Sequence, residues 1–275
     1  MNCKKWSSGK ERILYNNCCM EAIINEEIFN NLKNDVRYRM VEKPEYKYKE
    51  CGEWLLNVFI RNYPDKLHLL EFGIENDKFL NPVCFDYTDI LKSHVKLSTY
   101  NLSFCCISYT IKALNIFKHI HNKSLEELNI VEIGGGYGGQ AFLIIKIGKE
   151  LGYNINTYSI YDLEYPSKIQ NKYIKLTELD KLCSIMSFYN FMDTSERVSK
   201  YNFLVSNYAF SEISTEIQNE YIKNILGNVN HGFLLWNFLN RERVNPYFLN
   251  IPGIILNERE ECNPDVASNS LEIKY

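Results

Sequence analysis

The sequence predicts an α/β fold in which a doubly wound, mostly parallel sheet follows a mainly helical N-terminal part. Three observations predict it. After about residue 125, short apolar runs alternate with amphipathic stretches, a run of glycines interrupts the first alternation, and before residue 125 only helical periodicity is visible. The chain has 275 residues, 45% of them hydrophobic, which is enough apolar material for a packed core. We expect two parts, residues 1–124 and residues 125–275.

The N-terminal part contains three stretches with helical spacing. Residues 21–32 carry apolar side chains on related faces, residues 53–62 do the same until Pro64 ends the helix, and residues 104–119 form the longest apolar-faced stretch. Residues 76–82 lack this spacing and are expected to form a loop. We expect the helices to cap the sheet domain on the side where an acceptor would bind.

Seven strands are predicted in the C-terminal part, with helices between them. A capping box, Thr215 with Gln218, is expected to open one of these helices. Strands that alternate with helices indicate a parallel sheet with helices on both faces. The strands are expected at residues 128–133, 156–161, 183–188, 201–206, 231–238, 254–256 and 271–275, and helices over residues 140–151, after Pro166 and after Thr215.

Composition argues against several classes of function. Lys and Arg number 31 and Asp and Glu 34, so the chain has a net charge of −3 and no basic stripe of the kind that grips nucleic acid. No apolar run approaches the roughly 20 residues that span a bilayer, and the polar N-terminus does not resemble a signal peptide. The nine cysteines are odd in number and lack metal-type spacing, which favours reduced thiols. We therefore expect a cytoplasmic protein without a nucleic-acid or membrane partner.

The strongest motif is the glycine-rich run that follows the first predicted strand. Residues 132–139 read Glu-Ile-Gly-Gly-Gly-Tyr-Gly-Gly and lead directly into a predicted helix. Glycines at such a turn let the backbone approach a ligand closely, and the helix N-terminus presents free N–H groups to it. This arrangement predicts a nucleotide-like cofactor.

The glycine run fits two cofactor templates. Gly134, Gly136 and Gly139 match the Gly-x-Gly-x-x-Gly of dinucleotide-binding domains. Glu132 followed by Gly134, Gly136 and Gly138 matches the acidic-x-Gly-x-Gly-x-Gly of class I S-adenosylmethionine-dependent methyltransferases. The methyltransferase template is favoured, because an acid before the glycines suits a cationic amino-acid end and would repel a pyrophosphate.

Two further observations favour the methyl cofactor over a nicotinamide. The glycine run starts after residue 130, which leaves too little chain for the usual catalytic domain of a dehydrogenase, and no Tyr-x-x-x-Lys pair occurs. Asp162 follows at the end of the next predicted strand, where its carboxylate suits the two ribose hydroxyls of either cofactor. A helix N-cap is the alternative role for Asp162.

Three blocks of sequence resemble the sugar O-methyltransferase family. The resemblance extends from about residue 75 to the C-terminus and implies a Rossmann-like class I methyltransferase sheet of about seven strands, the last one antiparallel. It also implies methyl transfer from S-adenosylmethionine to a hydroxyl of a sugar, as a nucleotide-sugar or glycan precursor. The blocks are residues 129–140, residues 161–163 and residues 205–212 with Gln218 and Tyr221, and weaker matches lie at Asn76-Asp77, Asn81-Pro82 and Ser98-Thr99-Tyr100.

The resemblance implies roles for residues around the glycine run. Glu132 would support the loop and the ammonium end of the cofactor, and the alternate glycines would let its methionine part pass. Tyr137 and Gln140 would cover the cofactor or bind its carboxylate, with plain packing as the alternative for Tyr137. The expected cofactor-binding set is Glu132, Gly134, Gly136, Tyr137, Gly138, Gln140, Asp162, Leu163, Asn207 and Tyr208, with the adenine pocket near residues 190–193.

Methyl transfer to a sugar hydroxyl requires removal of its proton by a base or polarisation of its oxygen by a metal. Glu212 is the leading candidate base, and Asp77 and His94 compete with it. The alternative for Glu212 is an acid that stabilises the start of the following helix. No histidine pair has metal-ligand spacing, so Mg²⁺ held by carboxylates is possible on chemical grounds but has no support in the sequence.

Two other functions fit the same residues. One is an NAD(P)-dependent nucleotide-sugar oxidoreductase or epimerase, which would bind the dinucleotide at the glycine run. The other is a non-catalytic protein that keeps the methyltransferase fold as a binding module. Cofactor binding distinguishes the oxidoreductase from a methyltransferase, and turnover distinguishes the binding module from a methyltransferase.

Overall fold

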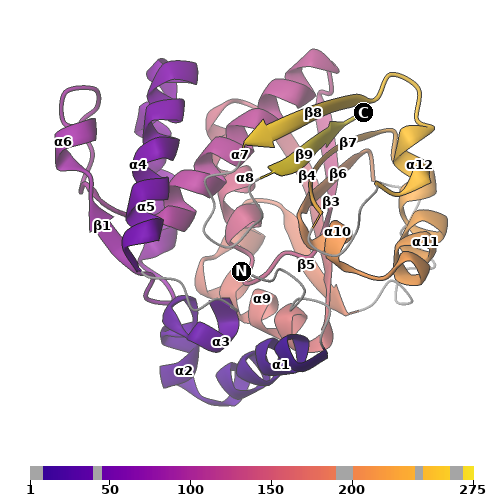
Figure 1. Cartoon of the computed structure of the whole chain (residues 1–275), viewed down its shortest axis with the longest axis horizontal. Coiled ribbons are helices and arrows are strands. Elements are labelled where there is room, and N and C mark those ends of the chain that lie inside the picture. The colour runs from indigo at the N-terminus through magenta and orange to yellow at the C-terminus, as the bar shows by residue number, and fades with distance from the viewer. Residues whose placement is uncertain (1–8, 40–44, 190–200, 239–243, 261–268) are drawn as a thin grey trace.

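A seven-stranded sheet forms the centre of the protein (Figure 1). The computed structural model describes residues 9–39, 45–189, 201–238, 244–260 and 269–275. Along the sheet the strands are ordered β5-β4-β3-β6-β7-β9-β8. Their bounds are β3 (Glu127–Ile133), β4 (Asn154–Asp162), β5 (Ser184–Tyr189), β6 (Phe203–Asn207), β7 (His231–Asn237), β8 (Ile255–Glu260) and β9 (Asn269–Lys274).

The strand directions confirm the predicted doubly wound sheet. β5, β4, β3, β6 and β7 are parallel, and β9 runs antiparallel to both of its neighbours. The chain builds outward from β3 to β5, then returns to the other side of β3 to add β6 and β7. The strand order therefore reverses between β3 and β6, and a crevice outside the carboxyl ends of strands at such a point is where α/β sheets bind ligands.

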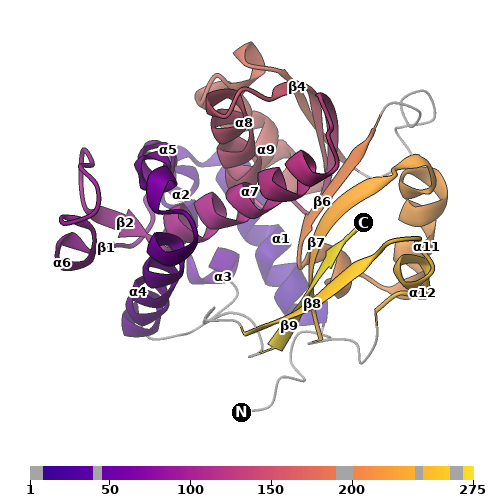
Figure 2. The same cartoon turned by 90° about the horizontal axis from the view of Figure 1, so that it is seen from above.

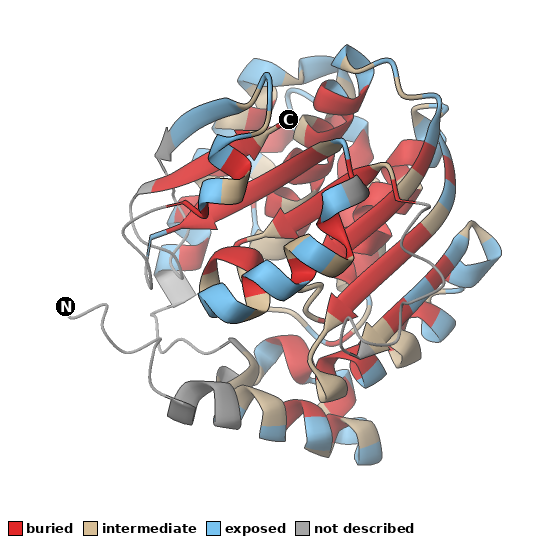
Figure 3. Ribbon diagram, turned by 90° about the vertical axis from the view of Figure 1, so that its right-hand side faces the viewer, coloured by how far each residue is buried: buried red, intermediate tan, exposed pale blue. Residues whose placement is uncertain are grey.

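The sheet is buried on both faces, which explains the continuous apolar runs of its strands (Figure 3). In β3, Leu128 and Ile130 belong to one hydrophobic core, whereas Val131 and Ile133 belong to the core on the opposite face. This alternation is the period of two expected for a strand.

Helices cover both faces of the sheet (Figure 2). One layer contains α7 (Phe104–Asn122), α8 (Gly139–Glu150) and α9 (Glu164–Leu176). The other face is covered by α10 (Ala209–Glu212), α11 (Thr215–Asn224) and α12 (Pro246–Leu249), with the short turn η7 (Leu226–Asn228) after α11. A further 3-10 turn, η4 (Leu179–Lys181), precedes β5.

The N-terminal part is mainly helical and adds to the layer formed by α7, α8 and α9 (Figure 2). Its side chains share one continuous core with these three helices. The chain also forms a short antiparallel ladder of two strands that periodicity does not predict. The elements are α1 (Gly9–Ile24), α2 (Glu26–Asn30), η2 (Leu32–Asn34), α3 (Val36–Arg39), α4 (Glu45–Asn62), η3 (Pro64–Leu69), α5 (Leu70–Asp77), β1 (Cys84–Asp86), α6 (Thr88–Leu91) and β2 (Asn101–Ser103).

Three local predictions are wrong. The expected helix over residues 21–32 is divided, because the side chain of Asn25 accepts hydrogen bonds from the amides of Glu27 and Ile28 and starts a new helix. The expected loop over residues 76–82 starts late, since α5 continues through Asp77. The cap of α11 is Ser214 instead of Thr215. In the parts of the chain that the structure describes, no helix is long and apolar enough to cross a bilayer.

Close packing of α8 against α7 and β4 provides a test of the fold. A Cβ added at Gly148 would lie 2.6 Å from the Phe117 ring and 2.7 Å from Cδ1 of Ile155. We expect Gly148→Ala to lower the free energy of unfolding by about 1–3 kcal/mol, because such overpacking displaces side chains. Lys149→Ala, at the exposed neighbouring position, should change it by less than about 0.5 kcal/mol. Chemical denaturation measures both, and equal stabilities of the two variants would contradict this packing.

Candidate functional site

The loop between β3 and α8 adopts a backbone that needs its glycines. Gly134, Gly136 and Gly138 have φ values of 76°, 58° and 100°. Side chains rarely adopt this left-handed region, so these three positions favour glycine. Gly135 and Gly139 have no such φ and are instead crowded by neighbouring side chains. The loop requires its left-handed glycines at alternate positions.

The carboxylate of Asp162, at the end of β4, holds this loop in place. One of its oxygens accepts from the amide of Gly136 at 3.2 Å and from Nε2 of Gln170 at 2.8 Å, and the other accepts from the amide of Leu163 at 2.8 Å. Gln170 also donates to the carbonyl of Gly136 at 2.8 Å. Burial raises the pKa of Asp162 to about 6, although these hydrogen bonds oppose the shift.

Glu132 lies beneath the loop and is 1% exposed. Its carboxyl group accepts a hydrogen bond from the hydroxyl of Tyr158 at 2.9 Å. Burial raises the pKa of Glu132 to about 8, and the charge of Asp162 adds to this. Glu132 therefore supports the loop from inside the fold, and its predicted contact with a cofactor ammonium remains a prediction.

Gln140 and Asn207 connect three elements at the edge of the sheet. Nδ2 of Asn207, at the end of β6, donates to Oε1 of Gln140 in the first turn of α8 at 2.9 Å. Gln140 in turn donates to the carbonyl of Tyr109 in α7 at 3.2 Å. Oδ1 of Asn207 is buried and has no hydrogen-bond partner among the described residues. It is available to accept from a ligand.

Tyr208 follows β6 with a left-handed backbone. Its φ is 69° and its ψ is −33°, which is rare for a residue with a bulky side chain. Its amide donates to the carbonyl of Leu235 at 2.9 Å, so the turn is held against β7. Such strain is typical of ligand-binding positions, where the surrounding structure maintains it.

Tyr137 has a packing role within the loop. Its hydroxyl accepts from Asn76 at 3.1 Å, and its ring meets the ring of Tyr173 edge-on at 5.3 Å between centroids. Nζ of Lys33 lies 4.6 Å from the centre of the same ring. The alternative expected for Tyr137, packing, is therefore observed, and the ring also forms part of a cavity wall.

A cavity of about 250 Å³ opens beside the loop. Seven of its lining side chains are aromatic, and they come from the N-terminal helices, from β1, from α7, from the loop and from the turn after β6. The lining is formed by Lys33, Tyr38, Tyr48, Pro82, Val83, Phe85, Ser103, Phe104, Cys105, Ser108, Tyr109, Lys112, Tyr137, Asn207 and Tyr208. Three predicted site residues, Tyr137, Asn207 and Tyr208, thus meet at one cavity.

The N-terminal helices cover the carboxylate of Asp162. Burial, the neighbouring Cys18 and the charge of Asp162 raise the pKa of the Cys19 thiol in α1. The rings of Tyr15 and Tyr38 lie 5.2 Å apart, which brings α1 and α3 together. A Cβ added at Gly136 would lie 3.4 Å from the hydroxyl of Tyr38. α1 and α3 therefore lie directly over the loop and the end of β4.

The three candidate bases lie in different places. Glu212, in α10, accepts from Nδ2 of Asn237 at 2.7 Å, and burial raises its pKa. Asp77 accepts from the amide of Ser103 at 2.8 Å and from its hydroxyl at 2.7 Å. His94 is exposed and follows α6, which lies at the edge of the molecule away from β3 and α8 (Figure 1). The described residues that line the cavity include none of these three candidate bases.

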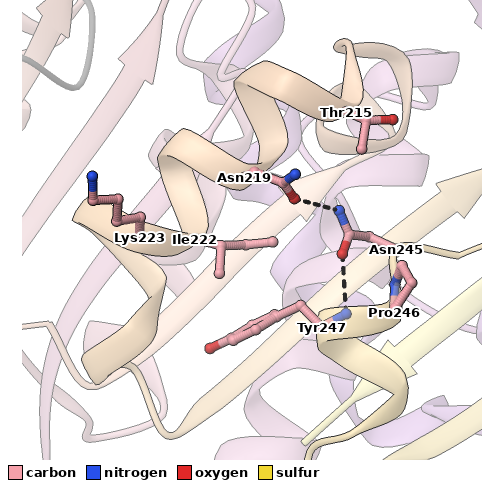
Figure 4. A pocket seen from close by; sticks show the side chains of 7 residues that line it. All are labelled: Thr215, Asn219, Ile222, Lys223, Asn245, Pro246 and Tyr247. Atoms are coloured by element: carbon pink, nitrogen blue, oxygen red, sulfur yellow. Dashed lines mark hydrogen bonds between the residues drawn. The ribbon is translucent and has the colours of Figure 1, made fainter.

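A second hollow lies on the opposite face of the sheet, between α11 and α12 (Figure 4). Its volume is about 460 Å³, and Asn245 is one of the residues that line it. The side chain of Asn245 donates a hydrogen bond to Gln218 at 2.9 Å and accepts one from the amide of Tyr247 at 3.0 Å. These bonds connect α11 with α12. The polar groups of this hollow therefore serve the fold, and the cavity beside the glycine loop is the better site.

Several residues of the site are not apparent from the sequence. Gln170 sits on the second turn of α9, and only its position on the face toward the loop gives it a role. Lys33 and Lys112 are buried at the cavity, and the only available signal is a lysine within an otherwise apolar helical pattern. The expected adenine pocket at residues 190–193 lies outside the described residues. Within the described chain no group of three potential metal-ligating side chains occurs.

No protein-family model matches the chain, and no curated protein matches it. Solved structures of methyltransferases are similar to it. The methyltransferase domain of bacterial CtHen1 covers 60% of this chain and 96% of its own, with 9% identity and a TM-score of 0.44. The methyltransferase domain of citrinin polyketide synthase covers 63% of this chain and 53% of its own, with 17% identity and a TM-score of 0.44.

Magnesium protoporphyrin IX methyltransferase from Synechocystis PCC 6803, solved with bound S-adenosylmethionine, is a third similar structure. It covers 62% of this chain and 80% of its own, with 13% identity and a TM-score of 0.43. All three TM-scores lie below 0.5. The function of this chain is therefore inferred from the geometry of its loop and cavity.

The buried carboxyl of Glu132 predicts a pH dependence of stability. Its ordinary pKa is 4.5 and its pKa in the folded protein is about 8, so between these values the folded state binds more protons. The free energy of unfolding should fall relative to that of Glu132→Gln as the pH rises from about 5 to 8, by up to ~1.4 kcal/mol per pH unit. Urea denaturation across this range measures the difference. Parallel curves would contradict it, and the exposed Glu150→Gln is the control.

Proposed function

We propose that the protein is an S-adenosylmethionine-dependent methyltransferase. The observation that carries the proposal is the set of left-handed backbones at Gly134, Gly136 and Gly138. Glu132 and these three glycines occupy the positions of the acidic-x-Gly-x-Gly-x-Gly template. Gly139, the third glycine of the dinucleotide template, lies in α8, which that template also allows, so the acid at Glu132 is what favours the methyl cofactor.

The residues at the carboxyl edge of the sheet fit this cofactor. The glycine loop has no Cβ atoms at its three left-handed positions, and this lets it pack closely against Ala209, Tyr38 and Tyr173 at the edge where a cofactor would bind. Asp162 lies at the end of the strand next to the loop, the position from which a carboxylate binds ribose hydroxyls. The unpartnered Oδ1 of Asn207 suits a donor such as the cofactor's ammonium group. Asp162 would therefore hold the ribose, and Asn207 the amino-acid end.

The proposed reaction is a displacement in which a hydroxyl oxygen of the acceptor attacks the methyl carbon. When bound, the cofactor supplies an electrophilic methyl group on a sulfonium. The protein must align the oxygen with this group, and such positioning supplies much of the rate enhancement. The turn at Tyr208 and the hydrogen bond between Asn207 and Gln140 fix the wall at which the alignment would occur.

The proposed acceptor is a small hydroxylated molecule of the sugar class. Its support is the resemblance of residues 129–140 and 205–212 to sugar O-methyltransferases, together with the nature of the cavity. Aromatic rings stack on the apolar faces of sugar rings, and Ser103 and Ser108 add hydroxyl groups to the wall. The volume of about 250 Å³ lies below the usual roughly 300–1,000 Å³ of small-molecule sites. A single ring suits this cavity better than a whole nucleotide-sugar.

Glu212 is retained as the candidate base on the resemblance of residues 205–212, although it does not line the cavity. One of its oxygens accepts from Asn237, and a raised pKa brings a carboxyl group nearer to the pH at which general bases act. Asp77 is a weaker candidate, because Lys33 and Ser103 already engage its carboxylate.

Cofactor binding tests the proposal directly. Isothermal titration calorimetry should detect binding of S-adenosylhomocysteine, the expected product of the cofactor, and no binding of NAD. Asp162→Ala should weaken the binding of S-adenosylhomocysteine by about 10- to 100-fold, since hydrogen bonds to a charged group contribute about 1.5–3 kcal/mol. Asp180→Ala removes an exposed carboxylate and is the matched control. Binding of NAD without S-adenosylhomocysteine would instead support an oxidoreductase.

Turnover tests the candidate base. We expect Glu212→Gln to reduce methyl transfer by about 10²- to 10⁴-fold, the usual contribution of a general base, and to leave S-adenosylhomocysteine affinity within about twofold. Transfer of a radiolabelled methyl group to a panel of sugars measures the rate. Undiminished transfer would eliminate Glu212 as the base. A wild-type protein that binds the cofactor product but methylates no member of a broad panel would favour a binding module.

A further inference from the structure

Two buried lysines form part of the wall of the cavity. Lys33, in η2, and Lys112, in the middle of α7, are each 7% exposed. They come from segments far apart in the sequence, and the fold brings both to the same cavity. Lysines are rarely so deeply buried, because transfer of an ammonium group out of water is costly.

Lys112 lies between two aromatic rings of the wall. Its Nζ is 5.5 Å from the ring centre of Tyr109 and 5.1 Å from that of Tyr208. Cation–π contacts of this kind are attractive and hold the ammonium at a defined place. That place adjoins the strained turn after β6, at the carboxyl edge of the sheet.

Lys33 is neutralised by Asp77, a residue that does not line the cavity. Its Nζ donates to the carbonyl of Asn76 at 2.9 Å and lies 3.8 Å from Oδ1 of Asp77. Asp77 does not line the cavity, and it is further fixed by Ser103. The ammonium of Lys33 also faces the ring of Tyr137 at 4.6 Å, so it is held by several groups at once.

Lys112 therefore places an ammonium group at the cavity wall, whereas the charge of Lys33 is offset by Asp77 behind it. The described lining residues include two lysines and no aspartate or glutamate. In a half-buried site an anionic group gains more from a lysine than it would in water, because screening is weaker. A neutral sugar would obtain only ring stacking and hydroxyl contacts from the same wall.

We infer that the acceptor carries a carboxylate or phosphate group, and that Lys112 binds this group. The acceptor is then an acidic sugar, either a sugar acid or a sugar phosphate. This inference rests on the proposed function, because it names the substrate class of that site. The carboxylate of the cofactor's amino-acid end is the other source of the same chemistry, and the experiment separates the two.

The test compares acidic and neutral sugars by calorimetry. In wild-type protein with S-adenosylhomocysteine present, D-glucuronate or D-glucose 6-phosphate should bind at least about tenfold more tightly than D-glucose, which corresponds to one hydrogen bond to a charged group. Lys112→Met should reduce this preference to less than about twofold, whereas Lys112→Arg should retain part of it. Lys149→Met, exposed on α8, should leave it unchanged.

A second comparison assigns the source of the anion. 5′-Methylthioadenosine lacks the amino-acid carboxylate of S-adenosylhomocysteine. Suppose that Lys112→Met weakens the binding of S-adenosylhomocysteine but not that of 5′-methylthioadenosine, and that the preference for acidic sugars stays intact. Lys112 then binds the cofactor, and the inference is overturned.

Equal binding of acidic and neutral sugars to the wild-type protein, or binding of neither acidic sugar, also overturns the inference, and this measurement needs no variant that might misfold. Failure of the proposed function gives a different result. In that case S-adenosylhomocysteine itself does not bind, and the acidic sugars are titrated without it.

Discussion

The site depends on the hydrogen bonds that the Asp162 carboxylate accepts. They join the end of β4 to the amide of Gly136 in the loop and to Gln170 in α9, so that strand, loop and helix share one anchor. Three donors satisfy most of a half-buried carboxylate whose removal from water would otherwise be costly. Glu132 and Tyr158 then support the loop from beneath. The conformation of the glycines follows from this anchor as much as from their own flexibility.

The other wall of the site depends on the turn after β6. The strained backbone of Tyr208 is maintained because its amide bonds to β7 and because Asn207 is held by Gln140. These contacts place an aromatic ring and an unpartnered amide oxygen at the cavity. The cation of Lys112 lies beside that ring. Backbone strain, a polar network and buried charge thus occur together at one edge of the sheet.

The sheet could be predicted because its strands are buried on both faces and therefore appear as apolar runs, two of which lead into Gly134 and Asp162. For the same reason the pattern of residues is enough to place Asp162 and the glycine loop at the carboxyl edge. Lys33 and Lys112 could not be placed in this way, because helices distant in sequence bring them to the cavity. The break between α1 and α2 is hidden because Asn25 interrupts an amphipathic pattern that continues on both sides. The left-handed backbone of Tyr208 has no signal in the residue type itself.

The position of α1 has a consequence for affinity and for rate. Tyr15, Cys19 and Tyr38 lie close to Asp162 and Gly136, so a ligand that needs α1 and α3 displaced to reach this carboxylate would bind only the molecules in which they are displaced. The dissociation constant then equals the intrinsic value divided by the fraction of molecules in the open arrangement. Association would be limited by opening as well as by diffusion. Residues of α1 and α3 that never contact the ligand would then help to determine its affinity.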